Sequence, residues 1–256
     1  MQQADALRAA FDAYLARHAF APEFGRLEET MRYALEPGGK RVRPVLCLAV
    51  CEAAGGDVED ALPAAAAVEL VHAFSLVHDD LPALDDDDER RGRPSAHVAF
   101  GEGVALLAGD ALLAEALRLA LSYEDRAVAG ELVEATLGMI AGQFRDVTGD
   151  VEDLAAVERL KTGSLLAASV GLGLRVAGLP EADQAPWREF GAELGLLFQV
   201  VDDILDQDGF VERLGAEGAR ALADEAAGRA NERLDALPAD TKVLRALVEG
   251  LAVRTG

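Results

Sequence analysis

Two acidic clusters contain most of the candidate functional groups of this chain. The first lies in HDDLPALDDDDERRGRPSAH, where seven carboxylates fall within the eleven residues 79–89. The second ends the stretch FQVVDDILD, residues 198–206. A run of acids usually marks a solvated face. Carboxylate oxygens are also the ligands that hard divalent cations such as Mg²⁺ prefer, so their arrangement decides between the two readings.

The first cluster follows an apolar helical stretch. Asp79 and Asp80 end this stretch, at the helix terminus where the macrodipole disfavours carboxylates. His72 shares a helical face with Asp79, which gives an inward polar stripe and indicates a cavity. Because Pro82 interrupts the helix, Asp85 can return toward Asp79 and pair with it as an oxygen ligand.

The second cluster also places carboxylates at the end of an apolar helical stretch. Asp202 and Asp206 are four residues apart and share a helical face with Gln199. One DDxxD motif arises by chance in acidic proteins. Two such motifs, each ending an apolar helix, predict carboxylates that face each other across a helical bundle and form a multi-metal pocket.

Charge reverses directly after the first cluster. Arg90 and Arg91 offer guanidinium groups that match phosphate oxygens, while Arg93 more simply balances the nearby acids. The net charge of −22 argues against nucleic acid or anionic membrane as a general partner. An anionic substrate would therefore need cations concentrated at its binding site.

The elements that position these residues are predicted to be helices. Hydrophobic content is 51% and aromatic content 5%, so Ala and Leu dominate the apolar surface, and the periodicity is helical almost end to end. We expect one all-α domain over residues 1–256. Prolines 22, 63, 180 and 238 are interpreted as lying at or just before helix starts. The predicted helices span residues 5–19, 22–35, 40–54, 63–81, 103–122, 125–148, 153–161, 163–178, 184–207, 216–237 and 240–253.

The cysteines, the first residues and the longest uncharged run all bear on the cell compartment in which the protein is expected. Cys47 and Cys51 have no companions at zinc-site spacing and are read as reduced core thiols. The first residues lack the apolar core of a signal peptide, and the longest uncharged run, 162–174, is too short to span a bilayer. We expect a soluble, cytoplasmic protein without an integral membrane segment.

Several motifs in order resemble the trans-prenyltransferase (polyprenyl synthetase) family, especially bacterial farnesyl and geranylgeranyl diphosphate synthases. Over residues 28–208 they are PGGKRVRP, the two acidic motifs, GDALL, GQFRD and KTGSLL. The resemblance implies a large helical bundle of the isoprenoid synthase type around a deep central cavity. It also implies a homodimer, for which the predicted helix 103–122 is a plausible face.

The resemblance implies a role for each matching residue. Small-molecule diphosphates would be the substrates, with about three Mg²⁺ ions per site. Metal would be held by Asp79, Asp85 and Asp202, supported by Asp80, Asp203 and Asp206. Isopentenyl diphosphate would be bound by Lys40, Arg43, His72 and Arg91. Arg90 would contact the allylic diphosphate. The site where the allylic cation forms would be lined by Lys161, Thr162 and Gln199. The plainer alternatives are helix capping by Lys40 and Arg43, a core histidine at 72, and a backbone hydrogen bond from Gln199.

Two features bear on product length and activity. Phe74 and Ser75 lie five and four residues before Asp79, about 6–8 Å down the helix at ~1.5 Å per residue. Phe74 is bulky enough to act as the floor of the pocket, and by resemblance favours a C15 product, farnesyl diphosphate, over C20. The chain departs from the family after the second motif, because residues 205–240 contain no lysine. Three hypotheses follow: the pocket closes in another way, for example with Arg213 or Arg220, the enzyme is slower, or it needs a partner.

Three other functions compete with a synthase. A class I terpene cyclase uses one DDxxD helix, but usually with a different second motif and without GGKRVRP. A non-catalytic, regulatory subunit of a heteromeric prenyl synthase is mildly favoured by the altered segment after residue 206, but the two intact aspartate motifs argue against it. A purely structural bundle is disfavoured by the polar stripes on buried helices.

Overall fold

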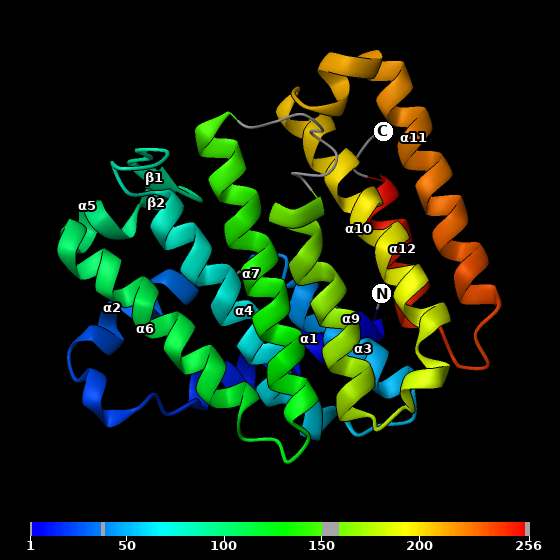
Figure 1. The fold of residues 1–256 in the computed structure, drawn as a ribbon, viewed down its shortest axis with the longest axis horizontal. Helices are drawn as coiled ribbons and strands as arrows, with labels where there is room; N and C mark the ends of the chain where they lie inside the picture. Colours follow the sequence, from blue (N-terminus) through cyan, green and yellow to red (C-terminus); the bar gives the residue numbers. More distant parts are fainter. Residues whose placement is uncertain (1, 37–38, 150–158, 254–256) are drawn as a thin grey trace.

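Helices make up almost the whole computed structural model, which describes residues 2–36, 39–149 and 159–253 (Figure 1). The all-α prediction is confirmed. The elements are α1 Gln2–Arg17, a 3₁₀ turn Pro22–Phe24, α2 Leu27–Leu35, α3 Val42–Ala53, α4 Val58–Asp79, β1 Glu89–Arg90, β2 Arg93–Pro94, α5 Ala96–Phe100, α6 Glu102–Ala120, α7 Arg126–Thr148, a π turn Arg159–Gly163, α9 Ser164–Val176, a 3₁₀ turn Glu181–Asp183, α10 Ala185–Asp206, α11 Phe210–Asp235 and α12 Lys242–Ala252. Most of the predicted helix 153–161 lies outside the described residues.

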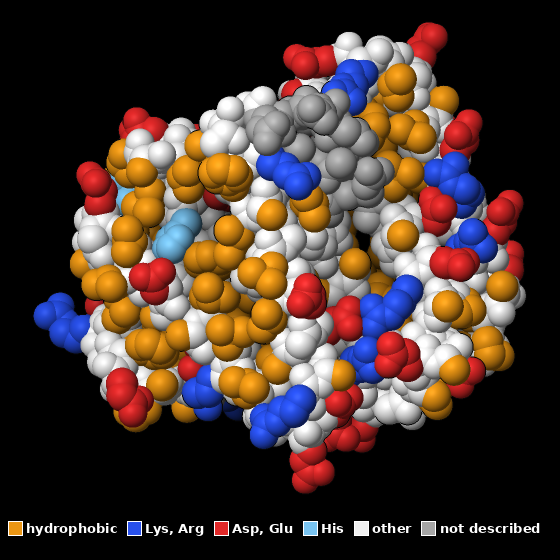
Figure 2. All heavy atoms as spheres, in the orientation of Figure 1, with side chains coloured by type: hydrophobic (Ala, Val, Ile, Leu, Met, Phe, Trp, Pro, Cys, Tyr) orange, Lys and Arg blue, Asp and Glu red, His pale blue; other side chains and the backbone are white. Residues whose placement is uncertain are grey.

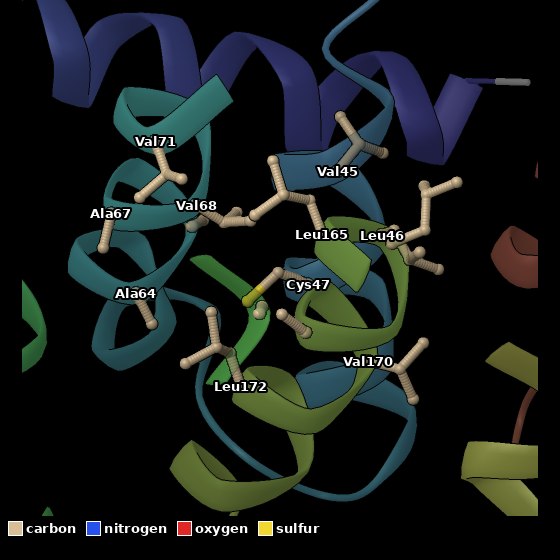
Figure 3. Close-up of a cluster of buried hydrophobic side chains, with 14 of the residues drawn as sticks. Val45, Leu46, Cys47, Ala64, Ala67, Val68, Val71, Leu165, Val170 and Leu172 are labelled. Carbon is tan, nitrogen blue, oxygen red and sulfur yellow. The ribbon is translucent and has the colours of Figure 1, made fainter. Parts of the chain in front are cut away.

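Helix α4 lies at the centre of the packing. It contacts α1, α2, α3, α6, α7 and α9, while α11 packs along α10 at one side of the molecule (Figure 1). Where α3, α4 and α9 meet, Cys47, Val68 and Leu172 are part of one buried apolar cluster (Figure 3). Within the described chain, α4 alone is long and apolar enough to cross a membrane, but 72% of that window is buried inside the protein. It is the apolar core helix that carries the first acidic cluster.

The start of α4 differs from the prediction. The helix begins at Val58, with Asp57 accepting a hydrogen bond from the Glu59 N–H, so Pro63 lies inside the helix and does not open it. The Tyr123 hydroxyl donates to the Asp60 carbonyl at 2.6 Å and accepts from the Ala64 N–H at 3.0 Å. A side chain from outside the helix therefore satisfies backbone groups next to the proline, which lets α4 continue through it.

Two glycines of α7 let another segment approach closely. A Cβ at Gly142 would lie 2.5 Å from the Lys161 backbone nitrogen, and one at Gly138 would lie 2.6 Å from the Ser164 Oγ. A larger residue at Gly142 would force the two backbones apart, whereas one at Gly138 would displace the Ser164 hydroxyl. Gly142 therefore allows the π turn Arg159–Gly163 to pack directly against α7.

A short hairpin follows the first acidic cluster. Strands β1 and β2 pair Glu89 with Pro94 and Arg90 with Arg93. Arg91 and Gly92 form the turn with φ angles of 56° and 76°, as a two-residue hairpin with positive φ at both central positions requires. The sequence predicted no strand here, because two residues per strand are too few to show alternation.

Candidate active site

Two adjoining cavities lie among the helices that carry the acidic clusters. The first, named here the cationic cavity, has a volume of about 600 Å³ and is lined by Gly39, Lys40, Arg41, Val42, Arg43, Glu69, His72, Arg91, Thr162, Phe198 and Asp202. The second, the apolar cavity, has a volume of about 460 Å³. It is lined by Arg43, His72, Phe74, Ser75, Leu76, His78, Asp79, Leu84, Met139, Ile140, Gln143, Phe144, Val147, Lys161, Thr162 and Leu165. Arg43, His72 and Thr162 line both, so the cavities meet at these residues.

Positive charge is concentrated around His72. Burial, and then the positive charges of Arg43 and Arg91, hold the pKa of His72 well below its usual range. Burial also lowers the pKa of Arg43, whose Nε has no hydrogen-bond partner within the described chain. Its guanidinium lies over the Phe198 ring, 5.6 Å from the centroid. Such a cluster of cations in a chain of net charge −22 has the charge that an anion requires.

Arg41 and Glu69 belong to this site, although sequence reasoning did not select them. Arg41 is buried and its Nη1 lies 2.6 Å from Glu69 Oε1. Its Nη2 donates to the Leu35 carbonyl at 2.7 Å, and its φ of 48° turns the chain into α3. Arg41 therefore fixes the loop from which Lys40 and Arg43 reach the cavity. A lone acid on an apolar helix, three residues before His72, was the available signal for Glu69.

After α4 ends at Asp79, the chain turns back and places Asp85 beside Asp79, while their joint binding of a metal ion stays a prediction. The Asp85 backbone N–H donates to the Asp79 carbonyl at 2.9 Å. Burial raises the pKa of the Asp79 carboxyl to about 6, opposed by Lys161 and reinforced by the negative charge of Asp85. Asp79 lines the apolar cavity, whereas the Asp85 side chain is exposed in the loop.

Asp80 faces a different environment from Asp79. It is 3% exposed and forms an ion pair with Arg90, whose Nε donates to Asp80 Oδ1 at 2.7 Å. Arg90 also reaches Asp87 at 3.5 Å. Neither Asp80 nor Arg90 lines the two cavities; both border a small separate pocket under the hairpin. The structure thus places this predicted pair of site residues against each other.

Asp202 and Asp203 of the second acidic cluster also lie in different surroundings. Asp202 lines the cationic cavity, and its charge, after that of Glu69, opposes the lowering of the Arg43 pKa by burial. Asp203 is 4% exposed and accepts hydrogen bonds from Gln199 Nε2 at 2.6 Å and the Phe210 N–H at 2.8 Å. Burial raises the Asp203 pKa, against the lowering effect of these hydrogen bonds.

The two other predicted residues of α10 lie away from the cationic cavity. Asp206 is exposed at the end of α10. Gln199 borders a third cavity, of about 430 Å³, between α9, α10 and α11. Of the second cluster, it is Asp202 that the structure brings to the cationic cavity.

The π turn supplies further polar groups. Lys161 lines the apolar cavity and pairs with Asp146 at 2.5 Å, while Thr162 lies where the two cavities meet. Gln143, which sequence reasoning noted only as part of GQFRD, lines the apolar cavity as well. Its Oε1 and Nε2 are buried without a hydrogen-bond partner in the described chain, so its amide is available to a bound molecule.

The carboxylates fit a cation that is shared with a substrate. Among the described residues, no group of three or more His, Cys, Asp or Glu side chains could alone hold a metal ion. Mg²⁺ ordinarily binds through one or two carboxylates, keeps several waters and takes its other oxygens from a phosphate. Asp79 and Asp202, in the walls of adjoining cavities, and Asp85 beside Asp79 are donors of this kind.

The segment after the second cluster brings no described arginine to the site. Arg213 and Arg220 are exposed on α11, and neither lines the cationic or the apolar cavity. Helix α11 is interrupted at Gly215, where φ is 72° and ψ is 164°. The hypothesis that Arg213 or Arg220 helps to close the pocket therefore stays a prediction.

The chain resembles known proteins over most of its length. The family model described as polyprenyl synthetase matches residues 25–229. The large subunit 1 of the heterodimeric chloroplastic geranylgeranyl pyrophosphate synthase of Arabidopsis thaliana is 46% identical over 217 residues, which cover 77% of this chain and 58% of that protein. The farnesyl diphosphate synthase of Bacillus subtilis (strain 168) is 42% identical over 204 residues, 74% of this chain and 69% of that protein.

Solved structures share the fold along the full chain. The geranyltransferase from Legionella pneumophila superposes with a TM-score of 0.90 at 30% identity, covering 99% of this chain and 96% of that chain. An FPP/GFPP synthase from Zymomonas mobilis gives a TM-score of 0.87 at 31% identity, with 98% of each chain covered. The matched motifs and the fold lead to one conclusion: the chain belongs to the polyprenyl synthetase family.

Proposed function

We propose that the protein is a magnesium-dependent short-chain prenyl diphosphate synthase, which joins isopentenyl diphosphate to an allylic diphosphate. One observation carries this proposal. The cationic cavity and the apolar cavity meet at Arg43, His72 and Thr162. A diphosphate group and an apolar tail need such a pair of environments side by side.

Each substrate has its own set of residues in this proposal. Isopentenyl diphosphate binds in the cationic cavity to Lys40, Arg43, His72 and Arg91, which line it. The allylic diphosphate lies between Asp79 and Asp202, with its prenyl tail in the apolar cavity. Asp79, Asp85 and Asp202 hold the Mg²⁺ that accompanies it. Asp80, Asp203 and Arg90 support the site indirectly and do not contact the substrate or the metal ion, since their side chains are paired with other protein groups.

The reaction requires charge stabilisation and exclusion of water. Mg²⁺, when bound, neutralises negative charge on the departing diphosphate. Lys161 and Thr162 lie where the allylic C–O bond would ionise, and the oxygen of buried Gln143 can face the carbocation. The double bond of isopentenyl diphosphate then attacks this cation to form a new C–C bond, and transfer of a proton from the resulting carbocation to the departed diphosphate completes the longer allylic product. The apolar walls keep water from the cation.

Product length in this proposal follows from the depth of the apolar cavity. Phe74 is buried and lies in its wall beside Ser75. A bulky ring at this depth favours farnesyl diphosphate, C15, over geranylgeranyl diphosphate, C20. Relatives named for each product are similar to this chain, so their names do not decide between the two.

In this proposal the protein acts in the cytoplasm as a homodimer. Exposed apolar side chains gather over one face formed by α6 and α7 (Figure 2). They are Val104, Leu106, Leu107, Val133, Leu137, Ile140, Phe144 and Val147. An apolar face of this kind is typical of a protein–protein interface, and a second copy of the chain is the partner proposed here.

A subunit of a heteromeric synthase is the second candidate, because one similar protein is named as the large subunit of a heterodimer. Assay of the purified chain alone separates the candidates. It is incubated with Mg²⁺, isopentenyl diphosphate and dimethylallyl, geranyl or farnesyl diphosphate, and the products are analysed by chromatography. Condensation products support the synthase. Cyclised hydrocarbons without use of isopentenyl diphosphate support a terpene cyclase, and no product from any starter supports the subunit.

A further inference from the structure

Phe74 is held by one specific neighbour on its own helix. Its ring meets the imidazole of His78 edge-on, with centroids 4.8 Å apart and an interplanar angle of 70°. Such edge-to-face pairs are favourable beyond the area that they bury. Both residues line the apolar cavity, so the orientation of Phe74 in its wall depends on where the His78 ring lies.

His78 is in turn held by α6. Its Nε2 lies 3.0 Å from the Leu106 carbonyl oxygen and 3.8 Å from Asp110 Oδ1. Between these two α6 residues is Gly109, and a methyl group there would overlap Nε2 and Cδ2 of the imidazole. The ring therefore occupies the space that the missing Cβ of Gly109 leaves on α6.

We propose that His78 and Gly109 are positioning residues for product length, acting through Phe74. This inference rests on the proposed function, in which Phe74 is the floor of the tail-binding cavity. Gly109 gives the imidazole a place against α6, and the imidazole supports the Phe74 ring. The depth of the apolar cavity is thus set from α6 as well as from α4.

The contact predicts opposite effects for two substitutions. Gly109→Ala displaces the imidazole from α6 toward Phe74 and the cavity, which shortens the space for the tail. His78→Ala removes the support of Phe74 and lets its ring turn away, which deepens the space. In the double variant the new methyl group meets no imidazole, so it behaves as His78→Ala alone.

The test measures product length and tail affinity for the wild type, both single variants, the double variant and Gly103→Ala. Gly103 is the matched control, since it is also on α6 and a Cβ there meets nothing within 4 Å. We expect the ratio of longer to shorter products to fall about tenfold in Gly109→Ala and to rise by a similar factor in His78→Ala. The double variant should match His78→Ala, and Gly103→Ala should match the wild type.

Binding of geranyl and farnesyl thiodiphosphates, measured by calorimetry, separates this inference from the proposed function. If the wild type makes no product, the proposed function fails, and the ratio of the two affinities tests the inference by itself. Gly109→Ala should then weaken farnesyl binding relative to geranyl binding, and His78→Ala should do the reverse. The inference is overturned if neither ratio changes, or if Gly109→Ala has the same effect with and without His78.

Discussion

Asp202 and Asp203 are neighbours in the chain but serve different surroundings. Asp202 lines the cationic cavity with Arg43, whereas Asp203 accepts the Phe210 N–H and so connects the end of α10 to the start of α11. A helix turns by about 100° per residue, at 3.6 residues per turn, so adjacent side chains cannot share a face. The two carboxylates of this motif therefore have separate roles, which substitution can distinguish.

Asp203→Ala should act on stability. It removes an acceptor at the N-terminus of α11 and is expected to lower the free energy of unfolding by about 0.5–2 kcal/mol. Asp202→Asn should leave stability nearly unchanged and lower kcat by about 10²-fold or more. Urea denaturation and steady-state kinetics of the two variants check this. Equal loss of stability in both, or full activity in Asp202→Asn, would contradict the assignment.

Arg43→Gln should weaken substrate binding. The guanidinium is buried beside the cavity and its Nε has no partner among the described residues, so a bound diphosphate gains a charge-assisted hydrogen bond there. Losing about 1.5–3 kcal/mol corresponds to a KM for isopentenyl diphosphate raised by about 10- to 150-fold. Arg233→Gln is the control, since Arg233 pairs with Glu189 on the surface. An unchanged KM in Arg43→Gln rules out this role.

Asp79 should make the metal-free protein less stable at neutral pH than at mildly acidic pH. Its pKa rises from 3.8 to about 6 on folding, so between these values the folded state binds more protons than the unfolded state. Stability from this group therefore falls as pH rises through about 6. Asp79→Asn should raise the Tm at pH 8 without Mg²⁺, with the difference vanishing near pH 4. Thermal melts across this range check it, and a lower Tm for the variant at pH 8 would refute it.

Phe74→Ala should lengthen the product. Removal of the ring opens the wall of the apolar cavity, so that farnesyl diphosphate can be extended before release. The substitution should also destabilise the fold by about 3–5 kcal/mol, because Phe74 is buried. Chromatography of products at a temperature where the variant is folded gives the answer. The floor assignment is wrong if the chain-length distribution stays that of the wild type.

The sequence predicts the parts of this site that depend on local rules. Pro82 disfavours a continued helix, and after α4 ends at Asp79 the Asp85 N–H reaches the Asp79 carbonyl. In each pair of adjacent aspartates, one lines a cavity and the other is bound to protein groups, and local rules do not predict which. Whether Asp80 points to a cavity or to Arg90 depends on a hairpin ten residues later, with two strands too short to recognise.

The prediction that Pro63 begins a helix was wrong, because the proline lies inside α4. A proline is a good marker of a helix start, but here the hydroxyl of Tyr123, distant in sequence, satisfies the backbone beside it. Arg41 and Glu69 were missed for a similar reason, because their ion pair forms only when α3 and α4 pack together. Long-range partners of this kind carry no local signal.

A crystal structure with Mg²⁺, geranyl thiodiphosphate and isopentenyl diphosphate would show whether both acidic clusters bind the same diphosphate group. We predict the thiodiphosphate between the first cluster and Asp202, bridged to both by metal ions. The geranyl tail should point toward Phe74, and isopentenyl diphosphate should contact Arg43 and His72. Metal bound to only one acidic cluster, or a thiodiphosphate bound outside the two cavities, would contradict the account.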